Sequence, residues 1–77
     1  MKTKYKYIEF VKQESGLRPD DTWQCLNRKK VLLGHVGYIA EWSEWEFCPT
    51  PNKGFTIVCL RDIAHFLDEL NKEKKPK

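Results

Sequence analysis

The sequence predicts a small α+β domain: an antiparallel sheet of four or five short strands with one C-terminal helix packed on one face. Short runs of aromatic and β-branched residues, separated by turn-forming residues, predict the strands. Apolar residues at helical spacing near the end of the chain predict the helix. A length of 77 residues supports one hydrophobic core. We therefore expect a single domain over residues 1–77, ordered from about 4 to 72, with a basic tail at 73–77.

The first strands follow from side-chain alternation and turn chemistry. Aromatic and apolar side chains alternate with polar ones from Lys4 to just before Ser15, which predicts the first strand. Glycine, proline and paired aspartates make Glu14 to Asp21 the longest predicted loop. A second strand is predicted over Thr22 to Leu26, and a hairpin turn over Asn27 to Lys30.

The third strand is predicted over Val31 to Tyr38 and contains two glycines, Gly34 and Gly37. Glycine weakens a strand, so its presence indicates a bulge, or a close approach by another backbone or a ligand. A turn at Ile39 to Glu41 then leads into a fourth strand, Trp42 to Cys48, which a proline-rich segment ends.

Alternation along the fourth strand predicts which side chains share a face. Trp45 and Phe47 lie on one face, where they should meet Val36 and Tyr38 of the third strand. The sequence leaves open whether Trp45 belongs to the core or to the surface.

The C-terminal helix is predicted from Cys59 or Leu60 to about Lys72. Two interpretations of the preceding residues remain: Thr56 caps a helix that already begins at Ile57, or it ends a short fifth strand begun at Phe55. The apolar stripe of the helix consists of Leu60, Ile63, Phe66, Leu67 and Leu70.

The aromatic content exceeds what one helix can cover. Three Trp, three Tyr and four Phe occur in this short chain. Large rings are costly to leave in water, so we expect an exposed aromatic patch that serves as a binding surface.

Composition limits the class of protein. The net charge is +3, and the longest apolar runs are too short to span a membrane. Three cysteines, without an apolar signal segment before them, favour a reducing, cytoplasmic location. The small core makes a homo-oligomer the expected state.

Catalytic and metal chemistry are not predicted. Cys48 and Cys59, with His35 and His65, are the available nucleophiles and bases, but no motif joins them. The cysteine spacing also fits no usual zinc arrangement. We therefore expect no enzyme activity, no catalytic residue, no metal ligand and no cofactor.

A resemblance covers the chain from about Trp23 to Leu70. Leu33-Gly34, Val36, Tyr38, Trp42, Trp45, Phe47 and Pro49, followed by Cys59-Leu60-Arg61-Asp62-Ile63, resemble a group of short uncharacterised proteins of phages and prophages. That group has the pattern LG-x-I-x-W, then W-R-x-Y-x-F-x-P, then C-L-x-D-I-x-x-F. This chain differs by Tyr38, Ser43 and Trp45, where Trp, Arg and Tyr are usual. The resemblance implies a phage accessory protein that acts on the host or its defences.

These observations predict a small binding protein that acts stoichiometrically in the bacterial cytoplasm. A nucleotide-like signal is the first expected ligand, because rings stack on bases and cations contact phosphates. A host protein inhibited through the aromatic patch is the alternative. Single-stranded nucleic acid is a second alternative, disfavoured by glutamates among the rings. The predicted ligand-binding residues are Trp42, Tyr38, Trp23, Arg28, Lys30, Arg61, Gly34 and Gly37.

Overall fold

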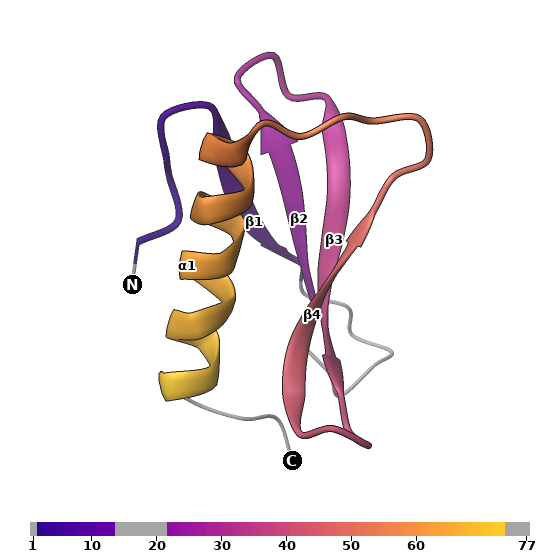
Figure 1. Ribbon diagram of the computed structural model, residues 1–77, viewed down its shortest axis with the longest axis vertical. Helices are drawn as coiled ribbons and strands as arrows, with labels where there is room; N and C mark the ends of the chain where they lie inside the picture. Colours follow the sequence, from indigo (N-terminus) through magenta and orange to yellow (C-terminus); the bar gives the residue numbers. More distant parts are fainter. Residues whose placement is uncertain (1, 14–21, 74–77) are drawn as a thin grey trace.

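The computed structural model describes residues 2–13 and 22–73, which form an antiparallel sheet with one helix across one face (Figure 1). The strands are β1 (Ile8–Gln13), β2 (Thr22–Asn27), β3 (Leu32–Ile39) and β4 (Glu44–Pro49), and the helix is α1 (Ile57–Glu73). The spatial order β1-β2-β3-β4 follows the sequence. The predicted α+β fold is confirmed. The predicted loop at 14–21 and the end of the predicted tail, 74–77, lie outside the described residues.

The strand register gathers the large apolar side chains on one face of the sheet. Residues directly opposite each other on neighbouring strands share a face. Tyr38 is opposite Trp45, as the alternation of both strands predicts. The same face carries two rows across the strands: Phe10, Cys25, Gly34 and Pro49 in one, and Trp23, Val36 and Phe47 in the next.

The first strand begins later than predicted. Residues 2–7, here called the N-terminal arm, fold back along the edge of β1 instead of extending it (Figure 1). The N–H of Phe10 donates to the carbonyl of Thr3 at 2.8 Å, and the N–H of Tyr5 donates to the carbonyl of Ile8 at 2.8 Å. The prediction of strand from Lys4 was wrong because alternation does not distinguish one strand from an arm that doubles back.

The connection between β3 and β4 also differs from the prediction. Trp42 was predicted to begin the fourth strand, but it lies in a turn over residues 40–43, here called the tip. Its N–H donates to the carbonyl of Ile39 at 3.2 Å, and the N–H of Ser43 donates to the carbonyl of Ala40 at 3.3 Å. Ser43 has a φ of 54°, in the left-handed region. The tip is therefore a hydrogen-bonded turn.

Gly34 marks both a bulge and a close backbone approach, as the sequence predicts. Cys25 pairs with Gly34, but Leu26 pairs with Leu32, so Leu33 is an extra residue on β3. A Cβ atom at Gly34 would lie 2.6 Å from the carbonyl oxygen of Cys48. Only a residue without a side chain fits there.

The helix begins at Ile57, two residues before the earliest start predicted from its apolar stripe. Thr56 caps it: the N–H of Cys59 donates to Oγ1 of Thr56 at 3.4 Å. The structure has no fifth strand among the described residues. Of the two interpretations of Thr56, the cap is confirmed.

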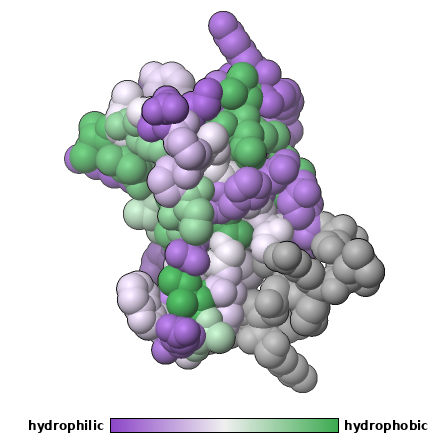
Figure 2. All heavy atoms as spheres, turned by 90° about the vertical axis from the view of Figure 1, so that its right-hand side faces the viewer, coloured by the Kyte–Doolittle hydropathy of each residue, from purple (hydrophilic) through white to green (hydrophobic). Residues whose placement is uncertain are grey.

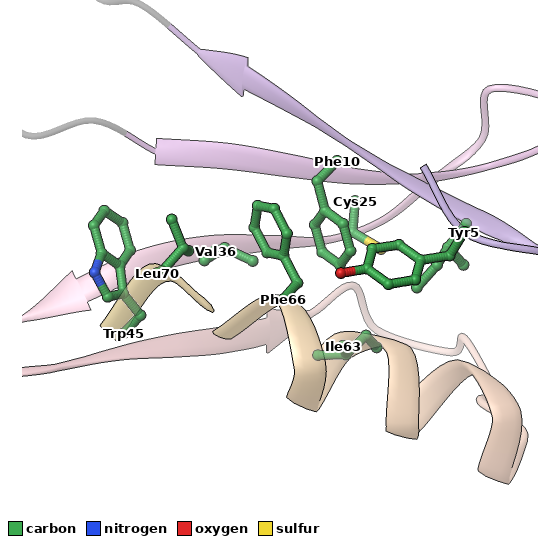
Figure 3. Packing of buried hydrophobic residues seen from close by; sticks show 9 residues of the cluster. Tyr5, Phe10, Cys25, Val36, Trp45, Ile63, Phe66 and Leu70 are labelled. Carbon is green, nitrogen blue, oxygen red and sulfur yellow. The ribbon is translucent and has the colours of Figure 1, made fainter. Parts of the chain in front are cut away.

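Phe66 is the centre of the core between helix and sheet (Figure 3). Its ring stacks on that of Phe10, with centroids 3.9 Å apart, and Trp23 meets it edge-on at 5.1 Å. Trp45 is 7% exposed and belongs to the core, which answers the question that the sequence leaves open. The buried set is Tyr5, Ile8, Phe10, Cys25, Val36, Trp45, Ile63, Phe66 and Leu70.

The helix also contacts the outer edge of β4. The backbone N–H of Trp45 donates to Oδ1 of Asn71 at 3.1 Å. Pro49, which has no N–H, ends the same strand. The end of α1 is thereby held beside the start of β4.

Candidate functional site

A pocket of about 230 Å³ lies where the N-terminal arm, β1 and the β2–β3 turn meet. Three of its lining side chains are cations and one is a carboxylate. We call it the cationic pocket; it is lined by Lys4, Tyr5, Ile8, Glu9, Asn27, Arg28 and Lys30. Two of these, Arg28 and Lys30, are among the ligand-binding residues predicted from the sequence.

The β2–β3 turn positions both of those cations. Oδ1 of Asn27 accepts hydrogen bonds from the N–H of Lys29 at 2.8 Å and of Val31 at 3.0 Å. The N–H of Lys30 donates to the carbonyl of Asn27 at 2.9 Å, and Lys30 has a φ of 66°. The turn predicted at residues 27–30 is confirmed, with Asn27 as its organising side chain.

Arg28 ties this turn to the N-terminal arm. Its Nε donates to the carbonyl oxygen of Lys6 at 2.7 Å. Its terminal guanidinium nitrogens and the ammonium of Lys4 have no hydrogen-bond partner within residues 2–13 and 22–73. Both groups are therefore available to an anion in the pocket.

Glu9 balances part of the positive charge. Its carboxylate accepts a hydrogen bond from Nζ of Lys30, and the two form an ion pair between β1 and the turn. This hydrogen bond is the largest cause that lowers the pKa of Glu9, with smaller contributions from the charges of Lys30, Lys4 and Arg28. Glu9 is ionised at neutral pH, so the pocket keeps an excess of positive charge.

Tyr5 forms the inner wall of the pocket and connects it to the core. Its hydroxyl lies 2.9 Å from Nδ1 of His65 on α1, and its ring packs edge-on against Phe10 at 5.9 Å. Burial raises the pKa of Tyr5, and the nearby charges of Asp62 and Glu69 raise it further. The ring is 8% exposed, so little of it is open for stacking by a ligand.

The structure separates the selected rings from the selected cations. Trp42 is 70% exposed at the tip, at the opposite end of β3 from the cationic pocket (Figure 1). Tyr38 packs on Trp45 at 5.6 Å, and Trp23 packs on Phe66. Of these three rings, only that of Trp42 is exposed, whereas Trp23 and Tyr38 pack against the core.

The three remaining predicted residues, Gly34, Gly37 and Arg61, lie in three different environments. Gly34 is closed off by Cys48 and Phe47, whereas nothing lies within 4 Å of a Cβ built at Gly37. The predicted helix start at Cys59 or Leu60 would place Arg61 in the first turn, but the helix begins at Ile57, after the Thr56 cap, which adds residues before it. Arg61 is therefore beyond the first turn, where the amides are already bonded within the helix.

The expected aromatic patch is absent from the described residues, so that prediction was wrong. Among the aromatic residues only Tyr7, 46% exposed, and Trp42 are open, and they lie at opposite ends of the sheet. The physical reason is that the N-terminal arm and Phe55, as well as the helix, help to cover the rings. Figure 2 shows hydrophobic groups separated by hydrophilic ones on the face that it presents.

Two of the three cysteines, Cys25 and Cys48, carry thiols whose pKa is raised. Cys48 lies opposite His35 on the uncovered face, but burial and Glu46 raise the pKa of its thiol. Burial raises the pKa of Cys25 to about 12. Both thiols are protonated at neutral pH and are therefore weak nucleophiles. Within the described ranges, no group of three His, Cys, Asp or Glu residues could hold a metal ion.

Five residues of the cationic pocket are not among the ligand-binding residues predicted from the sequence: Lys4, Tyr5, Ile8, Glu9 and Asn27. The signal for Asn27 was present, because asparagine at the start of a turn often bonds to the amides that follow. The pairing of Lys4 with Glu9 had no signal, since it depends on the arm folding back.

Comparison with known proteins gives no relative: neither a family model, nor a curated protein, nor a solved structure matches this chain. Within residues 2–13 and 22–73, no helix has the length and apolar character of a membrane span.

Proposed function

We propose that this chain is a non-enzymatic protein that binds a small phosphate-bearing, nucleotide-like molecule stoichiometrically in the cationic pocket. The convergence of Lys4, Arg28 and Lys30 on one pocket carries the proposal. Glu9 offsets one of these charges, so a phosphate would meet net positive charge. The guanidinium of Arg28, fixed through Nε, can direct its remaining donors at two oxygens of the same phosphate.

The size of the pocket limits how much of the ligand it encloses. A volume of about 230 Å³ is below the roughly 300–1,000 Å³ of sites that enclose a drug-sized molecule. The pocket therefore takes the phosphate end, and the base lies outside it. This differs from the expected site, in which Trp42 and Tyr38 stack the base beside the same cations.

The resemblance to short phage and prophage proteins gives the proposal its setting. In that setting the protein would sequester a nucleotide signal of host defence in the bacterial cytoplasm. Binding without turnover suits the chemistry of the chain, because the thiols of Cys25 and Cys48 are held protonated.

Native mass spectrometry of protein purified from cells in a phage-defence response tests the proposal, since a retained nucleotide would be released and weighed on denaturation. Titration calorimetry with inorganic phosphate, AMP, ATP and a cyclic dinucleotide then measures affinity. Arg28→Ala should weaken binding at least about tenfold, a loss of about 1.4 kcal/mol. The neighbouring Lys29→Ala, outside the pocket lining, should bind within about twofold of the original chain.

Either of two results would contradict the proposal. One is that none of the four probes binds and no small molecule is retained. The other is that Arg28→Ala and Lys29→Ala bind equally well, because the anion would then be held elsewhere.

One observation favours a second candidate, inhibition of a host protein. Trp42 is 70% exposed on a hydrogen-bonded turn, and exposed tryptophans are frequent anchors of protein interfaces. A specific host protein captured from a bacterial lysate by the original chain, but not by Trp42→Ala, would support this candidate. Equal capture by both would count against it.

A further inference from the structure

The described charges are distributed unequally along the sheet. Cations of the N-terminal arm and of the β2–β3 turn gather at one end, where Lys4, Lys6 and Arg28 lie. The N–H of Thr50 donates to the carbonyl of Leu33 at 2.9 Å, which brings the loop after β4, with Lys53, to the same end. This end is basic.

Among the described residues, the opposite end carries more acidic than basic side chains, with Lys12 of β1 as one of its cations. Glu41 and Glu44 are exposed at and beside the tip. The bond between Trp45 and Asn71 brings the last turns of α1, with Asp68 and Glu69, to this end. The cation among these turns, Lys72, is paired with Asp68 at 3.0 Å.

The helix dipole adds to this separation. The N-terminus of α1, with partial positive charge, lies at the basic end, and its C-terminus, with partial negative charge, lies at the acidic end (Figure 1). The first turn of α1 contains no acidic residue that would offset the positive pole. The charges of the described residues are thus polarised along the direction of the strands.

The tip and the cationic pocket are complementary in chemistry. The tip presents an open ring, Trp42, flanked by the carboxylates of Glu41 and Glu44. The pocket presents the cations Lys4, Arg28 and Lys30 around a floor whose apolar residues, Tyr5 and Ile8, are only 8% and 2% exposed. The face of an exposed Trp ring attracts cations, and its flanking carboxylates also gain by meeting them.

We propose that the tip of one copy docks in the cationic pocket of a second copy. Trp42 lies over the cations at the mouth of the pocket, and Glu41 and Glu44 pair with Arg28 and Lys4 of the second copy. The contact joins two different surfaces, so it leaves a free tip and a free pocket at the ends of each assembly. It goes beyond the proposed function, and it adds that a phosphate ligand and the tip compete for the same cations.

Sedimentation velocity over a wide concentration range tests the inference, with two variants that each remove one side of the contact. Trp42→Ala removes the tip, and Arg28→Glu removes the pocket. Each variant alone should be a monomer, whereas an equimolar mixture should form a one-to-one dimer through the remaining tip and pocket. Tyr7→Ala and Lys53→Glu, changes of an exposed ring and of a cation outside the pocket, should assemble like the original chain. Far-UV circular dichroism confirms that each variant folds.

Raising the salt concentration should weaken the assembly, because exposed charges are screened within about 8 Å at physiological ionic strength. Inorganic phosphate should dissociate it more effectively than chloride at equal ionic strength. A monomer at all concentrations, or a mixture of the two variants that stays monomeric while the original chain assembles, would overturn the inference. Binding of a nucleotide by the monomeric Trp42→Ala variant would leave the proposed function intact in either case.

Discussion

The hydroxyl of Tyr5 and Nδ1 of His65 are 2.9 Å apart, and their hydrogen bond joins residues separated by 60 positions. Nε2 of the same imidazole lies 3.5 Å from the carboxylate of Glu69. The carboxylate favours a proton on Nε2, which leaves Nδ1 as the acceptor for the tyrosine hydroxyl. The inner wall of the cationic pocket is thereby fastened to the helix.

Removing that hydroxyl should lower stability without disturbing the core. Tyr5→Phe keeps the ring contacts with Phe10 and should lower the free energy of unfolding by about 0.5–1.5 kcal/mol. Urea denaturation followed by tryptophan fluorescence measures the change. Tyr7→Phe removes a hydroxyl from an exposed ring and should leave stability unaltered. Equal losses in the two variants would show that the bond to His65 contributes nothing.

Gly34 and Gly37 provide a matched pair of substitutions on one strand. Gly34→Ala should destabilise the fold by about 1–3 kcal/mol, because the new methyl would lie 2.6 Å from the backbone oxygen of Cys48. Gly37→Ala meets open space and should be neutral or stabilising by up to about 1 kcal/mol. The midpoints of thermal unfolding compare them. A stable Gly34→Ala variant would contradict the close approach of β3 and β4.

Alkaline pH should destabilise the fold through Cys25. Burial raises its pKa from 9.0 to about 12, so the unfolded chain loses the thiol proton at lower pH than the folded chain does. The contribution is fully present below pH 9 and is lost as the pH rises from there toward 12, with a slope of at most about 1.4 kcal/mol per pH unit. Tyr5, whose pKa is also raised, adds to the loss above pH 10.

Urea denaturation at several pH values between 8 and about 10.5 measures this slope. Cys25→Ala should show a shallower slope, and Cys48→Ala, a change of an exposed thiol, should retain most of it. Identical slopes in Cys25→Ala and the original chain would assign the alkaline loss to other groups.

Asn71 should contribute measurably to the free energy of unfolding, although it lies near the end of the helix. Asn71→Leu leaves the backbone N–H of Trp45 without its acceptor and should cost about 1–3 kcal/mol of unfolding free energy. Lys72→Leu, a change at the next position, where the side chain is 68% exposed, should cost less than about 0.5 kcal/mol. If both variants unfold at the same urea concentration, the bond to Trp45 adds no stability.

Periodicity predicted the elements of this fold but not where the arm and the tip turn. The apolar stripe of the helix and the shared face of Trp45 and Phe47 follow from local spacing, which can be read directly from the sequence. The position of Trp42 depends on the hydrogen bonds of a turn that has Ser43 in a left-handed conformation, for which serine is an uncommon residue.

The candidate site was predicted only in part, for a related reason. Arg28 and Lys30 were selected as cations beside a turn, and the pocket contains both. Lys4 and Glu9 belong to it because the arm folds back on β1, a contact that depends on the whole fold. The predicted rings were expected near these cations, but they lie elsewhere. Alternation shows which face of the sheet a side chain lies on. It does not show which end of the sheet the side chain lies at, because that depends on the correct strand bounds.

The position of Asn71 beside β4 has a consequence for polymerisation of the sheet. An open edge strand invites a strand from another molecule, which needs free N–H and C=O groups at regular spacing. On the outward edge of β4, the N–H of Trp45 is already bound to Asn71, and Pro49 offers none. A foreign strand would meet an interrupted row of donors there, so growth of a continuous intermolecular sheet from this edge is disfavoured. The Asn71→Leu variant should therefore aggregate faster than the Lys72→Leu variant on mild heating.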